Sequence, residues 1–278
     1  ADKPRGVGFL SQNVSSLVNC QHALAKTKKN YLKKIYTNIN KPTILTLRHT
    51  SMGGHFKGTE TQRLALLYTL AAELNPHYID IESCVSNAFI TKLHAAYPAI
   101  KIIRSYHHFS ETPEDLEHIL SSMQHPQISA YKIVTYAQTS LDNLHVLHFV
   151  KKHATHINLV AHCMGPLGLP SRIIGAVLGN YFTYPRMPHS NTPGAHCPDV
   201  DTLTDIYNLK TCNKKTKIFA LLGNPVEHSI GHLFHNKKFK ALGLNALYLK
   251  IKLSIDELPA FFKSIKTLPF YGFSVPMP

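Results

Sequence analysis

Lys132 lies inside an otherwise apolar stretch, Ile128 to Thr135, whose β-branched residues are typical of a strand. Alternate side chains of a strand point to the same face, so Lys132 shares its face with Ala130 and Val134. Burial among such neighbours disfavours the charged ammonium, and a partly neutral amine can attack a ketone to form a Schiff base. The alternative is a structural lysine on an exposed edge strand, or one whose stem carries the ammonium to water.

Three further polar side chains lie at or just after the ends of other predicted strands. Arg48 closes one strand, His107 follows another, and Arg172 opens the helix after a third. A guanidinium fork binds a carboxylate through two hydrogen bonds, and an imidazole moves protons at neutral pH. Together with the amine of Lys132, these groups predict a site for a small keto acid. For each arginine taken alone, a role in a structural salt bridge is an equally good interpretation. For His107, a capping or surface role is an equally good interpretation.

Short β-branched runs alternate with amphipathic stretches from residue 42 onward. The predicted strands are Thr43 to Arg48, Tyr78 to Glu82, Ile100 to Ser105, Ile128 to Thr135, Ile157 to His162 and Tyr181 to Tyr184, and Gly6 to Leu10 could supply a seventh. Helix starts are predicted at Thr59 with Gln62, Thr112 with Pro113, and Thr139 with Asp142. Repeated strand–helix units imply a parallel sheet. The expected fold class is therefore α/β, a (β/α)8 barrel of the TIM type whose reacting groups gather at the carboxyl ends of the strands.

A short polar and basic segment, Asn208 to Thr216, interrupts this pattern. A new series follows it, with strands at Lys217 to Leu222, Ala246 to Ile251 and Phe270 to Val275 and helices at Ser229 to Leu242 and Ile255 to Ile265. We therefore expect two domains, the barrel over residues 1–212 and a partial α/β domain over residues 213–278.

The composition is that of an ordinary globular protein, with 44% hydrophobic and 17% charged residues. No apolar run reaches the roughly 18 to 20 residues that span a membrane, so no membrane partner is expected. Five cysteines without a C-x-x-C pair predict free thiols in a reducing cytoplasm, and 19 histidines without H-E-x-x-H spacing predict no metal site. The formal charge of +14 is compatible with an anionic partner, either nucleic acid or a small carboxylate or phosphate, and charge alone does not choose between them. The densest basic run, Lys26 to Lys34, lacks interleaved aromatic residues and has the pattern of a solvated helix face, and nucleic acid is not expected as a partner.

Six stretches between residues 42 and 208 carry a family pattern. They are Leu45-Thr-Leu-Arg48 followed by Gly53-Gly54, Tyr78-Ile-Asp-Ile-Glu82, Ile103-Arg-Ser-Tyr-His107 and on to Pro113, Tyr131-Lys132-Ile133, Pro170-Ser-Arg172, and Thr192-Pro-Gly194. In order and spacing they resemble the type I 3-dehydroquinate dehydratases. The resemblance implies dehydration of 3-dehydroquinate to 3-dehydroshikimate, without a cofactor, through a Schiff base between Lys132 and the C3 ketone. It also implies that His107 removes the C2 proton and then protonates the departing C1 hydroxyl, while Arg172 binds the substrate carboxylate and Arg48 lies beside it in the pocket.

The second series resembles the start of the substrate domain of the shikimate dehydrogenases. The matching stretches are Leu222-Gly-Asn-Pro-Val-Glu-His228-Ser229, His235-Asn236 with Phe239, Gly243-Leu-Asn245, and Gly272-Phe-Ser-Val275. The whole chain thus resembles a truncated dehydratase–dehydrogenase fusion of the kind found in chlamydia-like bacteria and plants, with Ser229 among the substrate-binding residues. A full-length fusion would use NADP. The chain itself has no nicotinamide-binding glycine motif, so reduction of dehydroshikimate by it is not expected.

Several positions depart from the dehydratase pattern. The glutamate that orients the catalytic histidine in the family is Met52 here, which accepts hydrogen bonds only weakly. The serine and glutamine that flank the Thr-Pro-Gly stretch are Asn191 and Ala195, and Asn191 is kept as a candidate for substrate binding. Two alternatives therefore stay open. One is a degenerate barrel that binds a ligand or scaffolds the dehydrogenase module without catalysis, and the other is a different Schiff-base barrel enzyme of the aldolase type.

Overall fold

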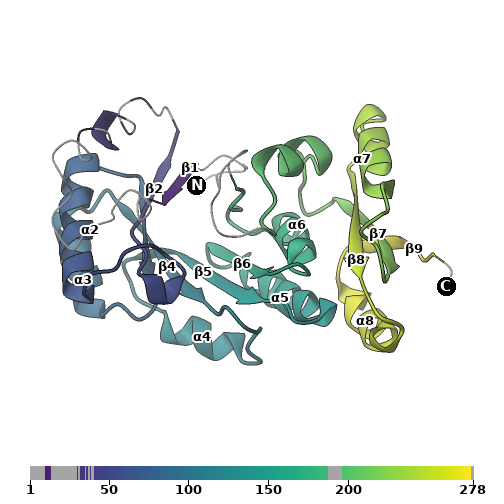
Figure 1. Cartoon of the computed structure of the whole chain (residues 1–278), viewed down its shortest axis with the longest axis horizontal. Helices are drawn as coiled ribbons and strands as arrows, with labels where there is room; N and C mark the ends of the chain where they lie inside the picture. Colours follow the sequence, from purple (N-terminus) through teal and green to yellow (C-terminus); the bar gives the residue numbers. More distant parts are fainter. Residues whose placement is uncertain are drawn as a thin grey trace. The chain divides into compact units, whose positions relative to one another are not determined.

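The structure is a computed structural model, and it describes residues 10–13, 30, 32–34, 36, 38, 41–186 and 196–276. The larger sheet has the strand order β1-β2-β3-β4-β5-β6, which is the order of the chain. Figure 1 shows the helices and strands with the labels used here, where there is room for them. Its first four strands pair in parallel. They are β1 (Leu10–Asn13), β2 (Thr43–Thr46), β3 (Tyr78–Glu82) and β4 (Lys101–His107). Neighbouring parallel strands that follow the chain order are what the wall of a (β/α) barrel requires.

The chain divides into two compact units, which are described separately. The described residues within Gly8–His107 and Ser121–Lys132 form the Lys132 unit, and those within His108–Leu120 and Ile133–Pro278 form the Arg172 unit. The division runs through α4 (Leu116–Ser122) and β5 (Ile128–Tyr136).

In the Lys132 unit, α2 (Glu60–Leu74) and α3 (Asn87–Ala96) share one hydrophobic core with β2, β3 and β4. The predicted start of α2 is confirmed. The Thr59 hydroxyl accepts a hydrogen bond from the Gln62 N–H, and the Gln62 side chain accepts one from the Thr59 N–H. All five residues of β3 are buried, so its two carboxylates, Asp80 and Glu82, lie inside the core and need partners there.

The Arg172 unit contains the rest of the large sheet and a second, smaller one. Its helices α5 (Ser140–His153) and α6 (Leu169–Leu178) flank β6 (Leu159–Met164) in the sequence. The second sheet is parallel, with the order β8-β7-β9, and its strands are β7 (Lys217–Gly223), β8 (Ala246–Lys252) and β9 (Phe270–Ser274). Its helices are α7 (Gly231–Ala241) and α8 (Leu258–Ser264), the latter preceded by the short η4 (Ile255–Glu257) and followed by η5 (Ile265–Thr267). The five elements predicted for this part of the sequence are confirmed.

A single hydrophobic cluster joins α5 and α6 to the second sheet. Its members include Leu144 and Leu147 of α5, Ile173 and Val177 of α6, Ile218 of β7, Leu247 of β8 and Phe261 of α8. Polar contacts accompany the cluster. The backbone N–H of Ser140 donates to Glu257 (3.3 Å), its hydroxyl donates to the Lys252 carbonyl, and His148 Nε2 lies 2.9 Å from the Ser264 hydroxyl. Within this unit α5 and α6 contact β6 of the larger sheet and also pack against the second sheet.

Two predictions about local structure are wrong. Tyr181 to Tyr184 is not a strand. The Tyr181 N–H donates to the Leu159 carbonyl of β6, and the Tyr184 carbonyl accepts from the side chain of Arg172. Thr112 does not begin a helix. Its hydroxyl donates to the Tyr136 carbonyl, and α4 begins only at Leu116.

Candidate active site

Lys132 is buried on β5. The residue is 6% exposed, and its ammonium donates to Asp80 Oδ2 at 2.9 Å. Burial lowers the pKa of Lys132 to about 8, although the charge of Asp80 opposes this effect; the positive charge of Arg48 lowers the pKa further. At that pKa roughly a tenth of the amine is neutral at pH 7. The predicted burial is confirmed, and the interpretation of Lys132 as an exposed edge lysine is wrong.

Asp80 connects the charged groups of this unit. Its Oδ2 accepts from both Lys132 and Arg48 Nη2, the latter at 3.2 Å, and its Oδ1 accepts from the Ser105 hydroxyl. Burial alone would raise the pKa of Asp80, but the two cations and the Ser105 hydrogen bond outweigh it and hold the pKa at about 2. Asp80 is therefore an anion at any physiological pH, and it anchors the lysine ammonium.

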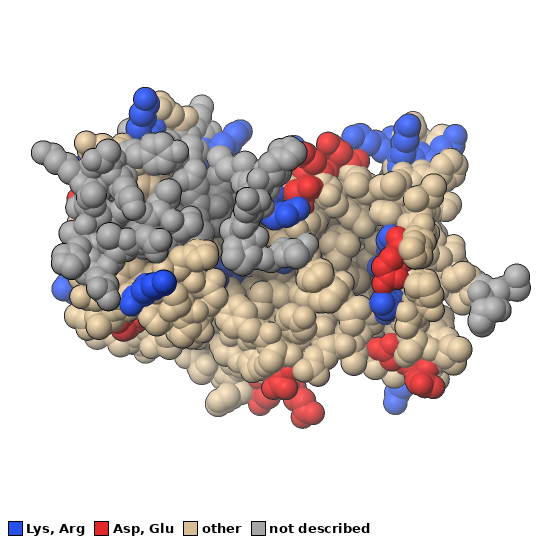
Figure 2. Space-filling view, viewed as in Figure 1, with Lys and Arg blue, Asp and Glu red and all other residues tan. Residues whose placement is uncertain are grey.

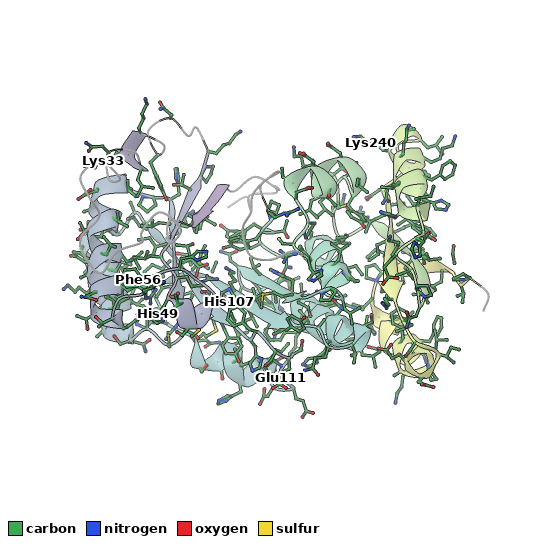
Figure 3. The ribbon with its side chains drawn as sticks, in the orientation of Figure 1. Lys33, His49, Phe56, His107, Glu111 and Lys240 are labelled. Carbon is green, nitrogen blue, oxygen red and sulfur yellow. The ribbon has the colours of Figure 1, made fainter. Side chains whose placement is uncertain are left out.

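Arg48 and His107 extend this chain of contacts. His107 ends β4, and Arg48 follows β2 (Figure 3 labels His107). Arg48 Nη1 lies 2.9 Å from His107 Nε2, while its Nε is 3.7 Å from Glu82 Oε1. We call Lys132, Asp80, Arg48 and His107 the Lys132 cluster. Three of the site residues predicted from the sequence thus come together, and the salt bridge proposed as an alternative role for Arg48 is present as well.

A second buried ion pair lies next to the cluster. Arg63 of α2 donates from Nη1 to Glu82 Oε2 at 2.6 Å and to the Leu47 carbonyl at 2.7 Å, and its other nitrogens contact Glu60. Burial raises the pKa of Glu82 in spite of this pairing. The contact with Leu47 joins α2 to the backbone directly before Arg48, so this pair helps to fix the position of Arg48.

Sequence reasoning did not select Asp80, Glu82, Ser105 or Arg63 as site residues. A signal for the two carboxylates was available, since Tyr78-Ile-Asp-Ile-Glu82 places them at alternate positions of an apolar strand, just as Lys132 is placed. Arg63 gives no such signal, because beside Glu60 on a helix it has the pattern of an ordinary exposed i, i+3 pair.

Arg172 lies in the first turn of α6, as predicted, and is 6% exposed. Its Nη1 donates to the Tyr184 carbonyl at 2.7 Å, and burial lowers its pKa. Among the described residues it forms no salt bridge with any carboxylate. A buried guanidinium of this kind is a strong candidate to bind the carboxylate of a ligand, because the ligand would supply the missing counter-charge.

Met52 lies at the end of η2 (Thr50–Met52), in the loop between β2 and α2. It lines a cleft of about 280 Å³ together with Glu60, Arg63, Glu82 and Cys84. Figure 3 labels His49 and Phe56, two residues of this loop that form a backbone bridge.

Ser229 and Asn191 are the remaining predicted site residues. Ser229, just before α7, accepts a hydrogen bond from the Gly231 N–H at 3.2 Å, and its carbonyl accepts one from Lys250. Asn191 lies outside the described residues.

Over the described ranges, no three His, Cys, Asp or Glu side chains gather closely enough to hold a metal ion. Four cysteines fall in these ranges, Cys84, Cys163, Cys197 and Cys212, and all are free thiols. None of the described helices has both the length and the hydropathy needed to cross a membrane. Figure 2 shows basic side chains gathered at α7, whose sequence carries Lys237, Lys238 and Lys240. Part of the basic excess therefore lies on α7.

Two family models match the chain. Residues 16–214 match the type I 3-dehydroquinase model, and residues 221–278 match the model of the shikimate dehydrogenase substrate binding domain. A 3-dehydroquinate dehydratase of Thermococcus gammatolerans is 39% identical over 153 residues, which are 54% of this chain and 70% of that protein. The chloroplastic bifunctional 3-dehydroquinate dehydratase/shikimate dehydrogenase of Arabidopsis thaliana is 32% identical over 255 residues. That match covers 90% of this chain but 42% of the relative's length.

A solved structure supports the fold. The type I 3-dehydroquinate dehydratase of Clostridium difficile superposes with a TM-score of 0.63 at 21% identity, covering 73% of this chain and 82% of that one. The expected fold class, a parallel α/β barrel sheet followed by a small parallel sheet, is confirmed. Since the dehydroquinase model covers well over half of the sequence, the chain belongs to the type I 3-dehydroquinase family, and residues 221–278 behind that match are similar to the shikimate dehydrogenase substrate binding domain.

Proposed function

We propose that this chain is a lyase that dehydrates 3-dehydroquinate to 3-dehydroshikimate, in the shikimate pathway, through a Schiff base on Lys132. The observation that carries the proposal is a buried lysine with a pKa of about 8, held at 2.9 Å by a permanently ionised Asp80. A lysine with an ordinary pKa would be almost wholly protonated at neutral pH and would attack ketones far more slowly. Family membership supplies the reaction class.

The reaction uses two groups of the Lys132 cluster in turn. The neutral amine of Lys132 attacks the C3 ketone, and loss of water from the adduct gives an iminium that makes the C2 proton acidic. His107 takes the C2 proton, the electron pair forms an enamine, and its collapse expels the C1 hydroxyl, which receives a proton from His107 and leaves as water. Hydrolysis of the imine then releases dehydroshikimate and restores Lys132. Each step uses groups of the chain and water, so we propose no cofactor for it.

We propose Arg172 as the residue that binds the substrate carboxylate. In support, its guanidinium is buried and has a carbonyl but no carboxylate partner among the residues described. Arg48 is proposed as a second contact, and Asn191 as a further one on the strength of its position in the family pattern alone.

For the second part of the chain we propose a role only as part of a longer protein. Because the chain spans 42% of the length of the Arabidopsis relative, the dehydrogenase reaction and its NADP cofactor belong to that longer protein, with Ser229 as a candidate contact for its substrate. The scattered free thiols still favour a reducing compartment such as the cytoplasm.

A degenerate barrel that binds a ligand without turnover is the second candidate, favoured by Met52 at the position of the family's orienting glutamate. Trapping with borohydride separates the two. Incubation of the chain with 3-dehydroquinate and borohydride should leave one reduced adduct on the peptide that contains Lys132. Both adduct and turnover should be lost in Lys132→Ala but kept in Lys101→Ala, which removes an exposed lysine from β4. No adduct, or an adduct on another lysine, would contradict the proposed reaction.

A further inference from the structure

The contact between Arg48 and His107 determines which ring nitrogen carries the proton. Arg48 Nη1 lies 2.9 Å from His107 Nε2. A guanidinium can donate hydrogen bonds but cannot accept them, and it stays protonated in proteins. His107 Nε2 must therefore be the acceptor. The contact exists only with a neutral ring whose proton is on Nδ1.

The guanidinium itself is held in place by buried groups. Its Nη2 donates to Asp80 at 3.2 Å, and its Nε faces Glu82 at 3.7 Å. Both carboxylates are on the fully buried β3 and have second partners, Ser105 for Asp80 and Arg63 for Glu82. A planar group fixed at several points cannot turn without losing one of these contacts, so it presents its remaining N–H in one direction.

The loop after Arg48 supplies no carboxylate that could do the same. Its residues from 49 to 54 are His-Thr-Ser-Met-Gly-Gly. The thioether of Met52 is too weak an acceptor to hold an imidazole N–H.

We propose that Arg48 is the positioning residue for His107 in this chain, and that it holds the resting ring in the Nδ1–H form with Nε2 unprotonated. The proposal rests on the proposed dehydratase function and deepens it. When the substrate enters, its oxygen atoms offer new acceptors to the guanidinium. Transfer of Arg48 to them frees the Nε2 lone pair, which then takes the C2 proton and later returns it to the C1 hydroxyl. The ring is thus prepared as a base before the substrate arrives.

The test is the ring tautomer of His107, read from the ring ¹⁵N chemical shifts of the full chain labelled at histidine, without substrate and at one neutral pH. His107→Gln identifies the signals by their loss. We expect the Nδ1–H form in the wild type and loss of this preference in Arg48→Met, together with a fall in kcat. Arg172→Met removes the other candidate arginine. It should raise KM and leave the His107 signals unchanged.

A wild-type His107 ring that carries its proton on Nε2 would overturn the proposal. This measurement is made on the wild type, and the only variant that must fold for it is His107→Gln, which assigns the signals. An unchanged tautomer in folded Arg48→Met would overturn it as well. Borohydride trapping distinguishes failure of the proposed role of Arg48 from failure of the proposed dehydratase reaction. An adduct on Lys132 with an Nε2–H ring rejects the role of Arg48 alone, whereas an Nδ1–H ring without an adduct rejects the dehydratase reaction alone.

Discussion

Asp80 affects both the charge state and the position of Lys132, the proposed nucleophile. One of its oxygens contacts both Lys132 and Arg48, so the negative charge is shared between an amine and a guanidinium. The sharing matters because the two neighbours of Lys132 act in opposite directions, with Asp80 raising its pKa and Arg48 lowering it. The pKa of about 8 is thus a balance of burial and two charges rather than a property of the lysine's burial alone.

Replacement of Asp80 by asparagine should shift the pH dependence of Schiff-base formation. Without the negative charge the pKa of Lys132 falls below about 8, so the midpoint of the rise in adduct formation with pH moves to lower pH. The rate of borohydride-trapped adduct formation, measured across pH, gives this midpoint directly. Ser105→Ala is the matched control, since it removes a hydrogen bond to Asp80 but keeps the charge. A midpoint that stays in place or rises in Asp80→Asn would show that Asp80 does not set the lysine's pKa.

The same replacement carries a cost in stability. Lys132 and Arg48 would both lose a buried counter-charge, and breaking a buried pair by removal of one partner costs about 3–5 kcal/mol. Activity of Asp80→Asn is therefore compared with the wild type only at temperatures where both are folded.

At the scale of elements, the loop between β2 and α2 determines where Arg48 lies. Its backbone is closed by hydrogen bonds from the Phe56 N–H to the Arg48 carbonyl (3.1 Å) and from the Gly54 N–H to the His49 carbonyl (3.0 Å). A Cβ on Gly54 would lie 2.0 Å from the Arg48 carbonyl oxygen and 2.6 Å from the Arg48 Cβ. The loop can close in this way only because residue 54 has no side chain.

Gly54→Ala should therefore reduce turnover by displacing Arg48, with a loss of stability of about 1–3 kcal/mol, as is usual for overpacking. Steady-state kinetics and thermal unfolding measure the two effects. Gly231→Ala is a suitable control, because a Cβ there meets its nearest neighbour at an ordinary 3.4 Å. Wild-type kinetics in Gly54→Ala would mean that the loop does not position Arg48.

The sequence allowed prediction of those elements whose signals are local. The capping box at Thr59 and the strand over Lys217 to Leu222 can be recognised within a few residues, and both are confirmed. The segment from Tyr181 was misassigned because its aromatic residues favour a strand, whereas strand formation depends on pairing and packing that the segment's own sequence does not contain. The burial of Lys132 could be predicted from its neighbours along one strand. Its pairing with Asp80 could not, because the two residues are 52 positions apart and meet only through the order of the strands.

At the scale of the molecule, the two family matches meet within one compact unit. The dehydroquinase match ends at residue 214, yet α5 and α6 from that match share a hydrophobic cluster with β7, β8 and α8 from beyond it. The contacts of Ser140 with Lys252 and Glu257 place a polar link at the start of α5. Cooperative unfolding follows packing rather than family boundaries, so we expect this unit to unfold as one.

Two adjacent phenylalanines of α8 allow a matched test of this expectation. Phe261 is 0% exposed and belongs to the shared cluster, whereas Phe262 is 42% exposed. Phe261→Ala should lower the free energy of unfolding by about 3–5 kcal/mol, the usual cost of emptying a core site, and Phe262→Ala by less than about 1 kcal/mol. Hydrogen exchange locates the effect. Because α5 packs on α8 through the cluster, its amides should lose protection in Phe261→Ala along with those of β7 and β8. If only the second sheet lost protection, the part of the chain that carries the dehydratase pattern would be stable without the part that follows it.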